Sequence, residues 1–428
     1  MCAMPARPVR RLTTALLGCL LLAGTLVACS AGGSHPAGAG ASAAGTNAPG
    51  STASGTIDGT TGGTAGAEAS GHQHGGAGSV SVAALRTGER WIDLPMPGGT
   101  YTPQAPNGGT DDYRCILLDP KLTRPTFLSG VVLEPGNPNL VHHAILYRVD
   151  PSEVAAARAK DASDPRLGWS CFGGPGLPSG RDVLGGLQSA PWVAAFATTG
   201  GEQRFAAGTG EKLAAGSLLI LQMHYNLLNG GGVDTTAVKL RVAAPGARLA
   251  PLQTMLLPAP VELPCPAGQT GPLCDRTAAV TDVMRRFGYD EGRTIAGLQL
   301  LCGGSLTAPR AGPRQSCTRD VTSTIHIQSV AGHMHMLGKS ISIDLQGADG
   351  TVVRLLDIPV WNFDDQRATV FDHPVTVGPG DRLTVTCTHD ASLRTKIPSL
   401  TTLPPRYVVW GEGSSDEMCL GIVGYTVS

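Results

Sequence analysis

Several features of common protein classes are missing from this sequence of 428 residues. Behind the N-terminal segment, no stretch is long and apolar enough to cross a membrane. Lys and Arg are nowhere clustered, which argues against nucleic acid as a partner. No Cys-x-x-Cys pair or tight group of Cys and His is present, which argues against a structural zinc site. These absences direct attention to the placement of the 11 histidines and 11 cysteines.

The N-terminal segment has the pattern of an export signal. Three arginines precede an uncharged apolar stretch that ends in LVAC at residues 26–29. These four residues resemble a lipobox, so we expect a signal peptide over residues 1–28 and lipid attachment at Cys29. The protein would then be exported and lipid-anchored to the outer face of the bacterial cell membrane, or periplasmic. An ordinary secretory signal is the alternative interpretation.

Residues 29–81 consist almost entirely of Gly, Ala, Ser and Thr. Such a segment has too little to bury, so we predict a disordered linker. His72 and His74 could catch a metal ion loosely, but an unstructured linker cannot fix the geometry of its ligands. Without the signal peptide the chain has 29 basic and 33 acidic residues, a net charge of −4.

The cysteines favour disulfide bonds. Cys2 and Cys19 leave with the signal peptide and Cys29 carries the lipid, which leaves an even number. An even set in an exported protein predicts a disulfide framework. The eight remaining residues are Cys115, Cys171, Cys265, Cys274, Cys302, Cys317, Cys387 and Cys419.

Residues 82–428 have the pattern of an all-β protein. Short apolar runs, such as HAILYRV, KSISIDL and RLTVTC, are separated by Gly, Pro, Asn and Asp. GADG at 347–350 predicts a hairpin and VGPGD at 377–381 a further turn. The pattern is that of a β-sandwich given twice, and we expect tandem domains over 82–245 and 246–428.

Signals for helices are few. The segment from Asp150 to Glu153 resembles the start of a helix, with Asp150 as the N-cap, Pro151 as the first helical residue and Glu153 as the third. It predicts a helix that ends near Asp161. A second helix is expected over 277–287.

Two histidines stand at the start of the run GHMHMLGKSISIDL, residues 332–345. If this run is a strand, His333 and His335 share a face, and two imidazoles on one face can bind one metal ion. In the first half, His142 and His143 are adjacent, so both reach one metal only from a bulge or a strand start. His224 lies in the strand pattern LLILQMHYN. Three imidazoles would suit copper or zinc, whereas the structural interpretation is polarity at strand ends.

Met418 lies next to Cys419 near the C-terminus. A buried methionine usually fills a gap in the core, but its thioether is also a soft ligand that favours Cu(I). Two histidines and one methionine would make a poor zinc site and a good copper site.

Five short motifs follow one another along the chain: VHHAILYRV, LQMHYN, GHMHMLGK, TVTCTHD and GSSDEMC. In this order they resemble the copper type II, ascorbate-dependent monooxygenases, over about Asp111 to Tyr425. The resemblance implies two jelly-roll-like β-sandwiches, two coppers per chain, and ascorbate or another one-electron reductant. It further implies that the electron-transfer copper is bound by His142, His143 and His224. The catalytic copper, which meets O2 and substrate, would be bound by His333, His335 and Met418.

The resemblance also suggests supporting residues. Gln222 would orient a neighbouring ligand, and His326 would be structural. Two disulfides carry over from family cysteines, Cys115–Cys171 and Cys387–Cys419. Two further pairings, Cys265–Cys274 and Cys302–Cys317, are hypotheses from proximity in the sequence, because short loops close at little entropic cost.

The chain departs from the family where the peptide-amidating relative binds its substrate's carboxylate. Those positions are Ala331, Leu420 and Ile422 here, so a buried carboxylate would find no charge partner. We therefore expect a small apolar or amine substrate for a copper-dependent hydroxylase. The alternatives are a copper-binding or redox-relay lipoprotein without hydroxylase activity, and a purely structural sandwich that would leave the histidines unexplained.

Overall fold

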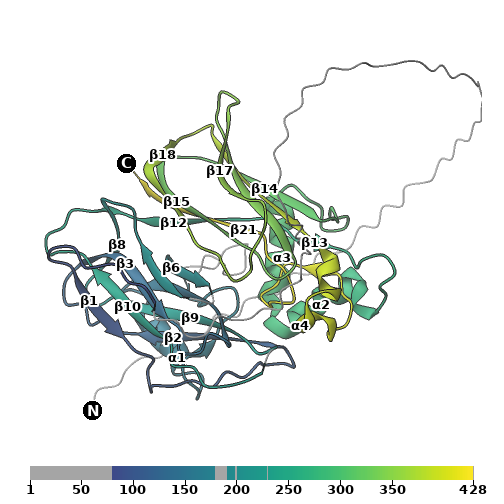
Figure 1. Cartoon of the computed structure of the whole chain (residues 1–428), viewed down its shortest axis with the longest axis horizontal. Coiled ribbons are helices and arrows are strands. Elements are labelled where there is room, and N and C mark those ends of the chain that lie inside the picture. Colours follow the sequence, from purple (N-terminus) through teal and green to yellow (C-terminus); the bar gives the residue numbers. More distant parts are fainter. Residues whose placement is uncertain (1–79, 179–189, 198–199, 229, 428) are drawn as a thin grey trace, which may run out of the picture. The chain divides into compact units, whose positions relative to one another are not determined.

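Figure 1 shows the computed structural model of the chain, which describes residues 80–178, 190–197, 200–228 and 230–427. The fold is all-β, as predicted: 41% of the described residues are in strands and 14% in helices. The described residues belong to one compact unit. The signal peptide, Cys29, His72, His74 and nearly all of the predicted linker lie outside the described residues.

The first half of the described chain contains two sheets (Figure 1). One sheet has the strand order β1–β10–β3–β8–β11, with β7 also paired to β3. Its strands are β1 (Arg90–Leu94), β3 (Thr126–Glu134), β7 (Gly201–Arg204), β8 (Thr209–Leu213), β10 (Ala237–Val242) and β11 (Ala250–Pro251). The other has the order β5–β2–β9–β4–β6. Its strands are β2 (Asp111–Leu118), β4 (Val141–Val149), β5 (Trp169–Ser170), β6 (Trp192–Ala197) and β9 (Leu218–Asn226).

These two sheets enclose one apolar core. Val131 and Leu133 of β3 pack in the same cluster as Leu146 of β4 and Leu221 of β9. Because side chains alternate along a strand, the opposite faces of β2, β4 and β9 remain to be covered. A second apolar cluster, which includes Cys115, Tyr147 and Trp169, covers these opposite faces. Both faces of this sheet are thus buried, so its histidines lie inside the protein.

The second half contains two four-stranded sheets, ordered β12–β21–β15–β18 and β14–β19–β16–β17, and the short pair β13–β20. The first sheet consists of β12 (Gln253–Pro258), β15 (Ile325–His333), β18 (Thr369–Val377) and β21 (Leu420–Val427). The second consists of β14 (Arg314–Asp320), β16 (Gly338–Gln346), β17 (Val352–Ile358) and β19 (Arg382–His389). The short pair is β13 (Glu262–Leu263) with β20 (Val408–Val409).

The alternating pattern of β16 shows why this segment is a strand. Ile341, Ile343 and Leu345 are buried in the core of the second half, and the residues between them are less buried. The hairpin predicted at 347–350 is confirmed, because β16 and β17 pair antiparallel around it. In the first half, β11 pairs with β8 although it lies beyond residue 245. A domain boundary at 245 stays a proposal.

The helices only partly match the predictions. Helix α2 (Arg276–Phe287) is confirmed, and Asp275 caps it by accepting a hydrogen bond from the N–H of Ala278. Helix α1 (Val154–Asp161) begins later than predicted. The carboxylate of Asp150 binds Arg148 instead of capping the helix, and the N–H of Glu153 closes a turn on the carbonyl of Asp150.

Helix α3 (Tyr289–Leu301) was not predicted. It follows α2 after Gly288, whose φ of 104° lies where side chains other than glycine are strained. The remaining short helices are η2 (Pro272–Cys274), η3 (Ala391–Thr395) and α4 (Pro398–Thr401). None of the helices in the described ranges has the length and hydropathy to span a membrane.

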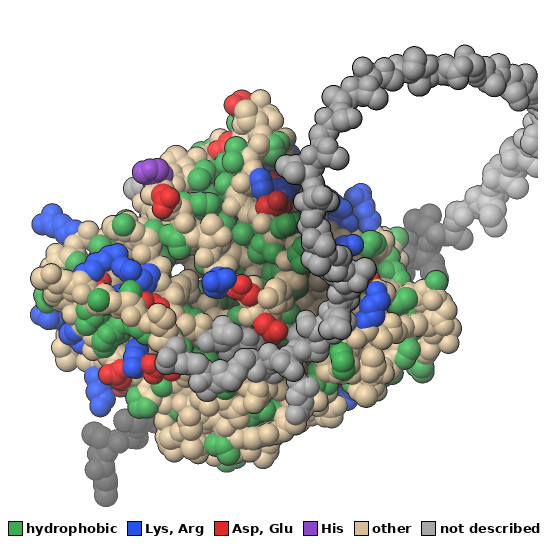
Figure 2. Space-filling model, in the orientation of Figure 1, with side chains coloured by type: hydrophobic (Ala, Val, Ile, Leu, Met, Phe, Trp, Pro, Cys, Tyr) green, Lys and Arg blue, Asp and Glu red, His purple; other side chains and the backbone are tan. Residues whose placement is uncertain are grey.

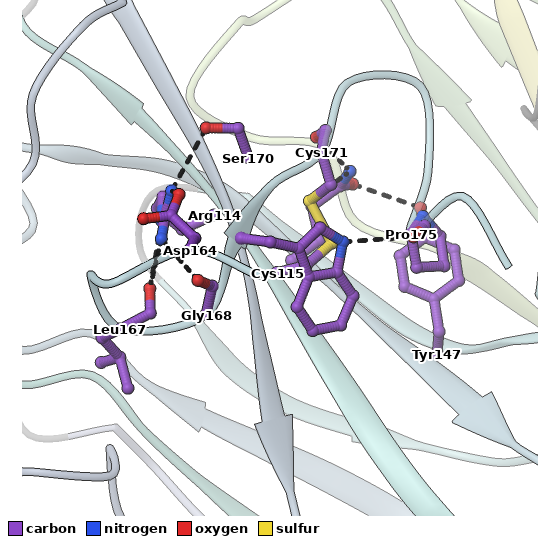
Figure 3. Close-up of a disulfide and its surroundings, with 11 residues drawn as sticks. Arg114, Cys115, Tyr147, Asp164, Leu167, Gly168, Ser170, Cys171 and Pro175 are labelled. Atoms are coloured by element: carbon purple, nitrogen blue, oxygen red, sulfur yellow. Dashed lines mark hydrogen bonds and ion pairs between the residues drawn. A yellow bond between two sulfur atoms is a disulfide. The ribbon is translucent and has the colours of Figure 1, made fainter. Parts of the chain in front are cut away.

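All four predicted disulfides are present: Cys115–Cys171, Cys265–Cys274, Cys302–Cys317 and Cys387–Cys419. Such a set indicates an exported protein. Beside the first of them, buried Arg114 donates to the carbonyls of Leu167 and Gly168 and to the carboxylate of Asp164 (Figure 3). On the face of the molecule that Figure 2 shows, basic and acidic side chains are interspersed.

Candidate metal and substrate site

Three imidazoles of the first half meet between β4 and β9. His142 and His143 lie at the start of β4, where the register against β9 shifts between Val141 and His143. This irregularity is the bulge that adjacent histidines require to reach one point. The Nδ1 atom of His142 lies 2.8 Å from that of His224 and 3.2 Å from that of His143. The third Nδ1–Nδ1 distance, between His143 and His224, is 3.3 Å.

Buried surroundings keep His142 and His143 in the neutral form that binds metals. Burial, reinforced by the neighbouring imidazoles, holds the pKa values of His142 and His143 well below the usual value for histidine. The Nε2 atom of His224 lies 2.8 Å from a carboxylate oxygen of Asp111. The carboxylate accepts a hydrogen bond from Nε2–H, so Nδ1 of His224 faces the other two histidines and the hydroxyl of Tyr113, which lies 2.9 Å away. The three Nδ1 atoms therefore converge on one place.

Two of the three nitrogen–nitrogen distances, 3.2 Å and 3.3 Å, match those around a metal ion, and the third, 2.8 Å, is shorter. Metal–nitrogen bonds of about 2.0–2.1 Å in a tetrahedral arrangement require nitrogens about 3.3 Å apart. Three imidazoles suit copper and zinc alike, so this set alone does not choose between them. The ligand atoms of these three histidines all lie within 4.8 Å of one another, close enough to hold one ion.

The second set is arranged differently from the prediction. His333 is the last residue of β15, and His335 lies in the turn between β15 and β16, so the two do not share a strand face. The strand interpretation of this pair was wrong because the chain turns after His333, where the N–H of Gly338 bonds to the carbonyl of His335. The two rings nevertheless lie with their centroids 5.2 Å apart.

The second set also offers free imidazole nitrogens. Nδ1 of His333 donates to Oε1 of Gln366 at 2.6 Å, which leaves the lone pair on Nε2. Burial and the adjacent His335 lower the pKa of His333 to about 3. Within the described part of the chain, neither ring nitrogen of buried His335 has a hydrogen-bond partner. Buried polar atoms without partners are costly, and a bound ion would satisfy them.

Glu417 connects this turn to the segment that carries Met418. Its buried carboxylate accepts hydrogen bonds from the N–H groups of His335 at 2.9 Å and Leu337 at 2.6 Å. Met418 follows directly, is 5% exposed, and its carbonyl lies 3.3 Å from Nε2 of His389. The disulfide of Cys419 holds the same segment to β19. Glu417 and the disulfide therefore hold the segments that carry Met418 and His335 in place next to each other.

The two histidine sets face each other. The ring centroids of His143 and His333 lie 5.3 Å apart, and those of His142 and His335 lie 6.1 Å apart. Phe363, from the second half, stacks on the ring of His142 at 4.2 Å. Residues far apart in the sequence thus form one continuous cluster of imidazoles.

An apolar pocket adjoins this cluster. Its lining includes His143, His333 and Met418, together with Trp192 and Phe196 of β6. None of the described lining residues is Lys or Arg. The pocket can therefore offer ligand-type side chains to a molecule that is itself held mainly by apolar contacts.

The three positions at which the sequence departs from the peptide-amidating relative all line this pocket: Ala331, Leu420 and Ile422. Ala331 of β15 lies directly opposite Ile422 of β21 in the sheet. The wall that would have to bind a carboxylate is consequently aliphatic.

Gln222 and His326, to which the resemblance assigns supporting roles, lie in different surroundings. Gln222 is buried, accepts a hydrogen bond from the hydroxyl of Tyr147, and donates to the carbonyl of Cys171. It thereby joins β4, β9 and the disulfide next to the first histidine set. His326 lies near the other end of β15, where Nδ1 is 2.9 Å from the hydroxyl of Thr376.

Sequence reasoning did not identify Asp111, Gln366 or Glu417 as residues of the site. Each contacts a histidine that is far away in the sequence, at separations of 113, 33 and 82 residues. Acidic residues and glutamines are common at such positions, so no local pattern marks them. For Glu417 there was one signal, its place directly before Met418.

Comparisons with known proteins agree with the resemblance in the second half. Residues 313–426 match the family described as "Copper type II ascorbate-dependent monooxygenase, C-terminal domain". The chain thus carries this domain, which confirms the family suggested by the motifs. A search of the curated proteins finds no match.

Several solved structures have a weak likeness to the chain. The major capsid protein P2 from Bacteriophage PM2 has a TM-score of 0.26 at 9% identity, over 79% of this chain and 97% of that one. Allantoicase has a TM-score of 0.17 at 10% identity, over 80% of this chain and 90% of that one. A fucolectin from striped bass serum has a TM-score of 0.16 at 8% identity, over 80% and 97%. Likenesses of this size carry no argument about this chain.

Proposed function

We propose that the protein is a copper-dependent monooxygenase, which hydroxylates a C–H bond of a small apolar or amine substrate. O2 and an external one-electron reductant, such as ascorbate, would be its co-substrates. One observation carries the proposal: two facing sets of buried imidazoles adjoin an apolar pocket that Met418 also lines. The family of residues 313–426 supports the same function.

In this proposal His142, His143 and His224 hold one copper, and His333, His335 and Met418 hold the other. When bound, copper supplies one-electron redox chemistry and a place where O2 is activated. The softer His2Met set favours the reduced ion, whereas the three imidazoles tolerate both oxidation states.

The other residues prepare these ligands. Asp111 and Gln366 each accept a hydrogen bond from a ring N–H, which fixes the tautomers of His224 and His333. Glu417 fixes the backbone of His335. The aliphatic wall around Ala331 excludes water, which protects reactive species during turnover.

Chemical analysis of the products tests the proposal. Copper-loaded protein is incubated with a reductant, 18O2 and a panel of apolar, amine and carboxylate-bearing substrates. We expect one 18O atom per product molecule from an apolar or amine substrate and none from a carboxylate. If the copper ions are reduced and reoxidised without 18O in any product, the redox-relay interpretation takes the place of the hydroxylase.

The location of the protein is part of the same proposal. The four disulfides indicate export. We add that Cys29 is lipidated and that residues 29–81 link this anchor to the catalytic part of the chain. The catalytic part would consist of two tandem β-sandwich domains. Mass spectrometry of the N-terminal peptide from membranes tests the anchor, because an unmodified Cys29 would contradict it.

A further inference from the structure

Two buried glutamates lie at the wall of the apolar pocket and directly behind it. Glu412 follows β20 and lines the pocket, and Glu291 belongs to α3. They are 4% and 3% exposed. Both approach Gly173, since a Cβ built there would lie 3.7 Å from Oε1 of Glu412 and 3.6 Å from Oε1 of Glu291. The two side chains therefore come together from distant parts of the sequence.

Neither carboxyl group has its full set of partners. Among the described residues, Oε1 of Glu412 and Oε2 of Glu291 are buried without a hydrogen-bond partner. An N–H from Gly173 and the hydroxyl of Tyr113 interact with Glu412. A carboxylate in this position would be poorly compensated.

The charged groups around the pair do not neutralise it. Arg286 faces Glu291, but its guanidinium is engaged by Asp416 at 2.7 Å and by Asp282 at 2.8 Å. Asp416 acts on both glutamates, and Asp290 acts on Glu291 as a further negative charge.

On the side of the first half, the pair faces phenols and an imidazole. The hydroxyl of Tyr113 donates to the carbonyl of Glu412. Burial raises the pKa of Tyr147, and the charge of Glu412 raises it further. His143 lines the same pocket as Glu412. None of these groups supplies a fixed positive charge.

Two neighbouring carboxyl groups in such surroundings cannot both ionise at low cost, so at least one of them keeps its proton. Burial and the proximity of Glu412 raise the pKa of Glu291 well above its ordinary value. Burial also raises the pKa of Glu412, to about 7. At neutral pH the pair therefore holds at least one proton close to the histidines.

We propose that Glu412 and Glu291 are a proton store for oxygen reduction, with Glu412 as the donor at the pocket wall. This role rests on the proposed monooxygenase function. The overall reaction is R–H + O2 + 2 e− + 2 H+ → R–OH + H2O, with the electrons supplied by the one-electron reductant. One of the two protons leaves Glu412 for the oxygen atom that ends as water, and the resulting carboxylate regains a proton from solvent between turnovers.

The retained proton is tested without copper or substrate. Infrared spectra of the full-length, metal-free protein at pH 7 report the C=O stretch of protonated carboxyl groups. We expect a band that the double variant Glu412→Gln/Glu291→Gln loses. Glu211 is a matched control, because it is buried and burial raises its pKa to about 7, but it does not line this pocket. If the band that the double variant loses is still present in Glu211→Gln, the proton store is supported. If the parent protein lacks this band, the proton store is overturned.

The donation is tested by turnover. Glu412→Gln keeps the size and a hydrogen-bonding oxygen of the side chain but cannot release a proton. Because general acids typically contribute at least 100-fold, we expect product formation to fall by about 100-fold, with copper content unchanged. We also expect the pH profile to lose the limb near 7, whereas Glu211→Gln should retain both.

Three outcomes separate the possible failures. If Glu412→Gln forms product at the parent rate, the pair is not the donor. If it raises only the KM for an amine substrate, the pair binds a cation and the proton store is overturned. If the parent protein forms no product at all, the monooxygenase function fails, while the infrared band still decides whether the pair retains a proton.

Discussion

The carboxylate of Glu417 accepts a hydrogen bond from the backbone N–H of His335 at 2.9 Å. It accepts a second one from Leu337, two residues further along the same turn. Because Glu417 directly precedes Met418, one side chain sets the distance between a proposed imidazole ligand and the proposed thioether ligand. Buried hydrogen bonds to a charged acceptor are among the stronger ones in proteins.

We predict that Glu417→Gln weakens copper binding at the second set by about 10- to 100-fold, the usual effect of removing a residue that orients a ligand. The amide keeps one acceptor oxygen but turns N–H groups towards a backbone donor. Copper titration of the metal-free protein measures the loss. Glu134→Gln is the control, because Glu134 binds Lys239 at a partly exposed site on β3. Equal copper affinity in Glu417→Gln and Glu134→Gln would contradict the positioning role.

The number of metal ions is a second prediction. Each chain should bind two copper ions, and His142→Ala and His333→Ala should each remove one, because the ions have separate ligands. Metal analysis after dialysis gives the stoichiometry. The facing rings of His143 and His333 make one alternative concrete. A single copper that is lost in either variant would mean that the cluster forms one shared site.

A third prediction concerns stability and pH. The hydrogen bond from Arg114 holds the pKa of Asp164 below its ordinary value, although partial burial opposes this. An acid with a depressed pKa stabilises the fold above its unfolded pKa of about 3.9 and loses this effect as the pH falls. Asp164→Asn should lower the free energy of unfolding by about 2 kcal/mol at pH 7. The difference from the parent should shrink below about pH 4.

Denaturant unfolding at several pH values measures this difference. Asp344→Asn provides the comparison, since Asp344 pairs with the largely exposed Arg354. Surface pairs contribute at most about 1 kcal/mol. If both variants lose the same small amount at every pH, the buried guanidinium of Arg114 does not depend on Asp164 (Figure 3).

The sequence predicted those features that depend on local patterns. Alternation marked the buried face of β16, and the adjacency of His142 and His143 already required the observed bulge. Helix α3 was missed because it has no capping side chain and only a weak apolar stripe. The turn at His335 was missed because one of the hydrogen bonds that hold it comes from Glu417, which no local pattern connects to it.

The same limit explains the glutamate pair. Glu291 is one acid in the first turn of a helix, a position where acids are common because they favour the helix dipole. Only the fold brings it against Gly173 and Glu412. A property that arises from three distant segments cannot be recovered from spacing within any one of them.

The final prediction concerns Met418. Isoleucine at this position keeps the apolar character and nearly the volume, so Met418→Ile should cost less than about 1.5 kcal/mol of stability. What is lost is the soft sulfur that favours the reduced, oxygen-reactive state of the ion at His333 and His335. We expect the variant to stay folded and to accept electrons at the first histidine set, while substrate-dependent oxygen consumption collapses. Oxygen-electrode assays and thermal unfolding measure the two effects.

Met334→Ile is the matched control for this experiment. Met334 is fully buried between His333 and His335 in the sequence, yet the resemblance assigns it no role as a ligand. Both substitutions remove one buried thioether from the same core cluster. If the two variants consume oxygen equally, or if Met418→Ile hydroxylates at the parent rate, Met418 is a packing residue. The ion held by His333 and His335 would then need another third ligand.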